Sequence, residues 1–183
     1  PVGAGKVTSL LFTAEGAGWI GTDNAELYHR PHPGAPWVLD QSPDLRGVVT
    51  EMAESSAGAW FGGRRLSLTL KPRDADVDWN PSPSLKPAAI DWRPLVVDSG
   101  DNLWIGGGVI LGMSMGGLLK YDGQDYHRFD LKDGLSDNAV LSATVAPDGT
   151  VWVGTANGAS HTDGKVIQPL YPADGLIHRE VLH

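Results

Sequence analysis

The sequence predicts an all-β fold made of four-stranded repeat units, and three observations carry this prediction. A short apolar run followed by a turn rich in Gly, Asn and Asp recurs along the chain, as tight β-hairpins require. No segment keeps the 3.6-residue apolar period of an amphipathic helix, so we expect very little helix. A four-residue word (Trp, an apolar residue, Gly, then Gly or Thr) occurs at spacings of 41, 44 and 48 residues, beginning at Trp19, Trp60, Trp104 and Trp152. A period of about 40–50 residues with four strands per unit is typical of a β-propeller.

Each repeat unit is expected to hold four strands in sequence. The first is an apolar run such as Val7–Phe12 or Val140–Val145, and the second is the Trp word. The third strand contains Tyr28, Tyr121 and His161, which we assign to one equivalent position, and the fourth carries Trp37, Trp79, Phe129 and Leu170. Because a large flat side chain buries much area, we expect the four anchor tryptophans to pack between blades rather than to stack on sugars.

The repeats divide the chain into blades at about 1–44, 45–87, 88–133 and 134–174, and residues 175–183 repeat the opening of the fourth unit in phase. The third unit carries about eight extra residues between its second and third strands, within 107–117. We therefore expect about four four-stranded blades plus the start of a fifth. Four blades plus the opening of a fifth do not close neatly into a ring, and an open arc of blades leaves sheet edges exposed. We therefore expect this chain to be part of a larger β-propeller, a partial β-propeller. Its remaining blades would come from further polypeptide or from a partner chain.

Composition excludes several classes of partner. The net charge is −8 and the chain has no cysteine. Without a basic stripe, nucleic-acid binding is not expected. No apolar run approaches the roughly 20 residues of a membrane helix, so no membrane contact is expected within this chain. We expect no cofactor, no metal site and no catalytic residue set.

The sequence pattern of the repeat resembles that of the two-component regulator propeller family. The best copy spans 134–164 and contains Asn138, the turn at Asp148, the word at Trp152, and Asn157 followed by Gly. The resemblance implies a periplasmic or extracellular sensor region of a hybrid histidine kinase. Such a region would bind a glycan fragment or another small molecule without turning it over.

Two alternatives stay open, because one fold hosts many functions. The first is an enzyme on the same scaffold, a polysaccharide lyase or glycoside hydrolase, for which Asp137 with His178 is the best available pair. The second is a protein-interaction scaffold.

Ligand contacts are expected on the face where the loops between second and third strands, and between successive blades, surround the central channel. Arginine forks suit carboxylates or sulfates, an indole stacks on a ring, and Met adapts to apolar shapes. Each residue also has a structural interpretation, as a solvated turn charge or as packing beneath a Pro-rich link. The candidate ligand-binding residues are Arg64, Arg65, Trp92, Asn24, Asn138, Asn157 and Met113. By contrast, His29 and Arg30 are expected at polar positions on the outer face.

Overall fold

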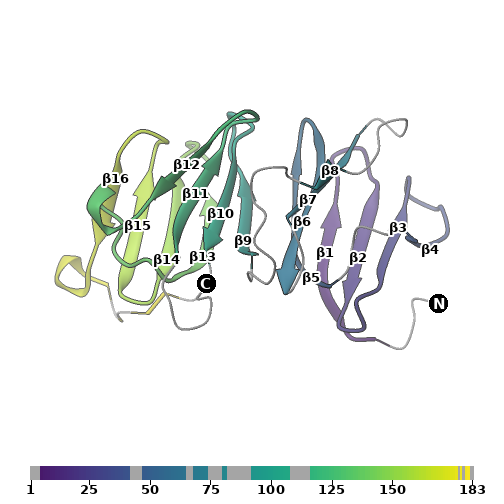
Figure 1. Cartoon of the computed structure of the whole chain (residues 1–183), viewed down its shortest axis with the longest axis horizontal. Helices are drawn as coiled ribbons and strands as arrows, with labels where there is room; N and C mark the ends of the chain where they lie inside the picture. The colour runs from purple at the N-terminus through teal and green to yellow at the C-terminus, as the bar shows by residue number, and fades with distance from the viewer. Residues whose placement is uncertain are drawn as a thin grey trace. The chain divides into compact units, whose positions relative to one another are not determined.

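The computed structural model describes residues 5–41, 47–64, 68–73, 80–81, 92–107, 116–176, 178 and 180–181. Within them the chain forms four four-stranded antiparallel sheets, with strand neighbours in sequence order (Figure 1). The helical content of this part is two 3₁₀ turns, and none of its helices is long and apolar enough to cross a membrane. The predicted all-β fold of four-stranded units is confirmed. The chain separates into two compact units, residues 1–90 and 91–183.

The first unit holds two sheets. One sheet consists of β1 (Val7–Phe12), β2 (Gly18–Thr22), β3 (Leu27–Arg30) and β4 (Val38–Leu39). The other consists of β5 (Val48–Ser55), β6 (Gly58–Arg64), β7 (Thr69–Pro72) and β8 (Asn80–Pro81). Strand β1 lies beside β5, so the two sheets pack face to face through their first strands.

The second unit repeats this arrangement. Its first sheet consists of β9 (Trp92–Val97), β10 (Leu103–Gly107), β11 (Gly117–Tyr121) and β12 (Tyr126–Phe129). Its second sheet consists of β13 (Val140–Val145), β14 (Val151–Thr155), β15 (Gly158–Thr162) and β16 (Ile167–Leu170). The 3₁₀ turns η1 (Leu131–Asp133) and η2 (Pro172–Asp174) follow β12 and β16. Strand β9 lies beside β13, as β1 lies beside β5.

Three of the four anchor tryptophans are buried between packed side chains. Trp19, Trp60 and Trp104 are 7%, 4% and 0% exposed, so packing accounts for three of the four. In the first unit Phe61, from the neighbouring sheet, packs edge-to-face with Trp19, with ring centroids 5.1 Å apart. Trp152 differs, because 39% of it is exposed.

The glycine of the first Trp word, Gly21, lets strand β5 approach the first sheet. A Cβ on Gly21 would lie 2.6 Å from Ser9 Oγ and 2.9 Å from the carbonyl oxygen of Val49. That carbonyl accepts hydrogen bonds from Thr8 Oγ1 (2.6 Å) and Ser9 Oγ (3.0 Å). Any side chain at Gly21 would therefore force β5 away from the first sheet.

The last sheet has a partner of the same kind. A Cβ on Gly154 would collide with the backbone at Val181, and Ser142 Oγ donates to the Val181 carbonyl at 3.4 Å. The amide of Val181 in turn donates to the carbonyl of Thr155 at 3.0 Å. The backbone at Val181 thus meets the fourth sheet as β5 meets the first.

The strand register corrects the assigned position of His161. His161 lies opposite Trp152, whereas Tyr28 lies opposite Ile20 and Tyr121 opposite Leu103. The equivalents of His161 are instead His29, opposite Trp19, and Lys120, opposite Trp104. Counting residues from the tryptophan gives a different answer because the turn is one residue longer in the first sheet: the residue opposite the tryptophan lies ten positions after Trp19 but nine after Trp152.

Candidate functional site

Four of the predicted ligand-binding residues can be assessed only by their place in the chain. Arg65 and Met113 lie outside the described residues. Arg64 is the last residue of β6 and Trp92 the first of β9, and their side chains lie outside the described part of the structure. Their contribution to a ligand site stays a prediction.

The three predicted asparagines lie in turns. Asn24 is exposed in the turn between β2 and β3, and Asn157 is exposed in the turn between β14 and β15. Asn138 is half-buried, and its Oδ1 accepts a hydrogen bond from the amide of Leu131 at 3.2 Å. Because Asn24 belongs to the first unit and the other two to the second, their convergence on one ligand stays a prediction.

The pair considered for an enzymatic role serves local turns. Asp137 Oδ1 accepts from the amide of Ala139 at 2.8 Å, and His178 Nδ1 accepts from the amide of Glu180 at 3.1 Å. Among the described residues, no group of three or more His, Cys, Asp and Glu side chains is arranged to hold a metal ion.

A cavity of about 340 Å³ lies in the first unit, where its two sheets meet. We call it the 1–2 cavity. It is bounded by the turns that follow β1 and β5 and by the ends of β3 and β7. In an antiparallel sheet these turns and strand ends lie at one end of the strands, and the turn carrying Asn24 lies at the opposite end. The cavity therefore lies at the end of the strands opposite to the end where ligand contacts were expected.

The floor of the 1–2 cavity is built around Trp19. Lys71 Nζ lies 5.1 Å from the centre of the Trp19 ring system, and the imidazole of His29 lies 5.1 Å from it on a tilted plane. Asp40 joins the two, because its Oδ2 is 3.3 Å from Lys71 Nζ and 3.5 Å from His29 Nδ1. The Asp40 side chain is only 5% exposed, so this carboxylate is a buried counter-charge.

His29 is an inward-facing residue, so its predicted outer-face position is wrong. Its side chain is 31% exposed, and it lines the cavity. Burial, with a further contribution from Lys71, lowers the pKa of His29 against the opposing effect of Asp40. The imidazole is therefore neutral at neutral pH.

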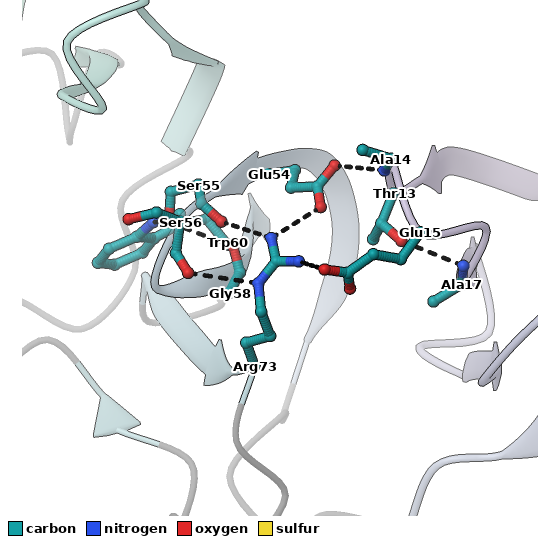
Figure 2. Close-up of polar contacts among 10 residues, drawn as sticks. All are labelled: Thr13, Ala14, Glu15, Ala17, Glu54, Ser55, Ser56, Gly58, Trp60 and Arg73. Carbon is teal, nitrogen blue, oxygen red and sulfur yellow. Dashed lines mark hydrogen bonds and ion pairs between the residues drawn. The ribbon is translucent and has the colours of Figure 1, made fainter.

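The rim of the 1–2 cavity is an ion-pair network centred on Arg73 (Figure 2). Its guanidinium pairs with Glu15 from the first sheet and, at 3.0 Å, with Glu54 Oε1 from the second. It also donates to the backbone carbonyls of Ser55 and Ser56 at 3.2 and 3.3 Å. Arg73 thus uses its planar fork to tie the two sheets together at the cavity mouth.

Glu54 adds a second link between the sheets. Its Oε2 accepts a hydrogen bond from the amide of Ala14 at 2.9 Å, while its Oε1 pairs with Arg73. Figure 2 shows both contacts meeting at the Glu54 carboxylate. The side chains of the cavity are therefore held in place before any ligand arrives.

Arg30 lines the cavity, but its guanidinium is engaged elsewhere. Its Cζ lies 5.3 Å from the ring centre of Phe12 and 4.9 Å from that of Trp37. This arrangement is a cation–π contact with two aromatic rings. The charged groups in and behind the cavity are thus Arg30, Lys71 and Arg73 against Glu15, Asp40 and Glu54, which balance.

A second hollow lies beside Trp152 in the second unit. Its volume is about 460 Å³, and Ala143, Val153 and Val181 line it. The Trp152 ring stacks on His161 with centroids 4.6 Å apart, and its Nε1 donates to Thr150 Oγ1 at 3.1 Å. Among the four anchor tryptophans, Trp152 alone is exposed.

One feature of the sequence points to the 1–2 cavity. In three sheets the residue opposite the anchor tryptophan is ionisable, as His29, Lys120 and His161 show. An ionisable side chain beside a buried indole breaks the apolar pattern expected of blade packing. Lys71, Asp40 and Arg73 carried no such signal, since the pairing of Lys71 with Asp40 spans 31 residues and that of Arg73 with Glu15 spans 58.

Comparisons with known proteins agree on the fold. Residues 134–157 match the family model described as Two component regulator propeller. No curated protein matches the chain. The extracellular domain of BT3049, named as a hybrid two-component system of B. thetaiotaomicron, is 20% identical with a TM-score of 0.73 over 97% of this chain and 24% of that chain.

Two further solved structures are similar. The extracellular domain of BT4673, named as a hybrid two-component system of the same organism, is 20% identical with a TM-score of 0.69, over 92% of this chain and 22% of that one. PorZ, a surface component of the type-IX secretion system of Porphyromonas gingivalis, is 16% identical with a TM-score of 0.63, over 92% of this chain and 27% of that one. The chain thus spans about a quarter of the length of these structures.

The structural likeness establishes the fold, and the family match identifies one repeat within it. The matched segment begins at Gly134 and contains the Trp152 word, which are the residues that carried the predicted resemblance. The chain therefore has a β-propeller fold, and its residues 134–157 match the two-component regulator propeller family.

Proposed function

We propose that this chain is part of the extracytoplasmic sensory region of a bacterial two-component receptor, and that its blades bind a glycan fragment or another small molecule. The observation that carries the proposal is the match of residues 134–157 to the two-component regulator propeller family. The likeness to extracellular domains of two-component systems supports the same role and an extracytoplasmic location.

The construction of the blades suits binding without chemistry. Antiparallel sheets hold turn residues of neighbouring blades at fixed separations, so polar groups from two blades can meet one ligand without reorganising. The link from Arg73 to both Glu15 and Glu54 is a described example of such a prearranged contact. A ligand that touches two blades stabilises their mutual packing, and that stabilisation is a signal that a receptor can transmit.

The test is a thermal-shift screen of the full chain against neutral and acidic oligosaccharides, with chromatography of each candidate after incubation. We expect at least one compound to raise the melting temperature and to be recovered unchanged. A ligand at about 100 times its Kd adds about 2.7 kcal/mol to the free energy of unfolding, which such a screen detects.

Two outcomes would replace the proposal. Consumption of a polysaccharide would favour the enzyme alternative, and its loss on changing Asp137→Asn would locate the chemistry. A screen without any shift, combined with specific capture of a protein partner, would favour the scaffold alternative.

A further inference from the structure

We propose that the 1–2 cavity binds one uncharged ring-shaped polyol, such as a neutral monosaccharide unit, and discriminates against the acidic counterpart of the same sugar. The inference rests on the proposed function and adds to it a site and a charge class.

The size of the cavity points to a single ring. Its volume of about 340 Å³ is at the small end of the range of about 300–1,000 Å³ that ligand pockets occupy. Its lining includes Trp19, Ala17 and Ala59 together with Pro31 and Pro72. These apolar surfaces suit the C–H faces of a pyranose.

The charges around the cavity are already matched. Lys71 lies 3.3 Å from Asp40, and Arg73 pairs with both Glu15 and Glu54. A ligand carboxylate would have to displace one of these built-in partners or lie beside two carboxylates. Either arrangement leaves a charge without compensation, which costs binding free energy.

A hydroxyl group faces no such penalty, because it both donates and accepts hydrogen bonds. Each carboxylate oxygen of Glu54 has capacity for a second donor beyond the amide of Ala14 and the guanidinium of Arg73. His29 Nδ1 lies 3.5 Å from Asp40 Oδ2. The lowered pKa of this imidazole leaves it neutral, able to donate from one ring nitrogen and accept at the other.

The experiment uses the full chain and two matched pairs of probes, glucose with glucuronate and galactose with galacturonate. Saturation-transfer NMR detects binding, and calorimetric titration measures the affinity. The members of a pair differ only at C6, which carries a hydroxyl group in the neutral sugar and is a carboxylate in the acid. Within a pair we therefore expect the neutral sugar to bind at least about tenfold more tightly than the acid.

Two substitutions locate the binding. Ala17→Leu places a larger side chain in the cavity wall and should lower the affinity for the neutral sugar at least about tenfold. Ala156→Leu makes the same change at an exposed turn position of the second unit that does not line the cavity, so the affinity of this variant should equal that of the unchanged chain. Unchanged binding in Ala17→Leu would overturn the assignment of the site.

A charge substitution keeps the inference testable if Ala17→Leu does not fold. Glu15 is 65% exposed, so Glu15→Gln removes one carboxylate from the rim without opening the core. The neutral-to-acid affinity ratio should fall at least about threefold. Asp125→Asn, an exposed change of equal charge in the second unit, should leave the ratio unchanged.

The outcomes separate this inference from the proposed function. If the wider screen finds a ligand but neither neutral sugar binds, or the acids bind more tightly, the inference fails while the sensory role stands. If neither the screen nor the sugars show any binding, both fail.

Discussion

Removal of the buried Trp104 should cost far more folding free energy than removal of Trp152, although both occupy the same position in the repeat. Trp104 is 0% exposed, stacks on Phe129 with centroids 5.8 Å apart, and donates from Nε1 to Asp98 Oδ2 at 2.7 Å. Trp152 is 39% exposed. For a side chain of about 250 Å², this difference leaves about 100 Å² more in water, worth about 2.5 kcal/mol at about 25 cal/mol per Å².

The expected costs follow from that area. Trp104→Ala should destabilise the chain by about 3–5 kcal/mol, as for other fully buried aromatic residues. Trp152→Ala should cost about 1–2 kcal/mol, after subtraction of the area that is already in water. Both residues lie in the second unit, so the two values describe the unfolding of the same unit.

Urea denaturation followed by far-UV circular dichroism measures both costs, at two protein concentrations so that self-association is visible. Trp104→Phe serves as a control, because it keeps most of the packing and loses the hydrogen bond to Asp98. Equal costs for Trp104→Ala and Trp152→Ala at both concentrations would refute the reasoning from exposed area.

Three other perturbations probe the first unit. Because burial and then Lys71 lower the pKa of His29, the unfolded chain binds more protons, so the free energy of unfolding should decline as pH falls below about 6.5. His29→Gln should flatten that decline in thermal melts from pH 7.5 to 5.5, and an unchanged slope would contradict it. Gly21→Ala should cost about 1–3 kcal/mol in denaturant titrations, since its Cβ would crowd the Val49 carbonyl, and a neutral effect would show that β5 can move. Arg73→Gln should lower the melting temperature at low salt, with the deficit shrinking near about 1 M salt; a deficit independent of salt would argue against an ion-pair role.

The fold was predictable from the sequence because its signal is local and repeated. In the Trp word the tryptophan meets the demand for a large side chain between sheets, as the three buried anchors show, and the glycine meets a second demand, room for a neighbouring strand. Gly21 and Gly154 show that second demand directly, since a Cβ at either would meet the backbone or hydroxyl of an adjacent strand. The turn chemistry between strands adds a further signal within a few residues.

The register within a blade was less predictable. His161 was aligned with Tyr28 by counting from the tryptophan, and the strand pairing shows that it corresponds to His29. The turn after Trp19 is one residue longer than the turn after Trp152. Hydrogen bonding across the strands, not distance along the chain, decides which side chains face each other.

What the sequence determined by itself was the kind of blade and the number of visible repeats, because strand period, turn residues and anchor positions all act over short distances. What only the tertiary structure decided was which side chains meet between blades. The exposure of Trp152 depends on what covers its sheet, and the 1–2 cavity joins Glu15 to Arg73 across 58 residues. Such contacts arise from the stacking of sheets, and a repeat pattern describes one sheet at a time.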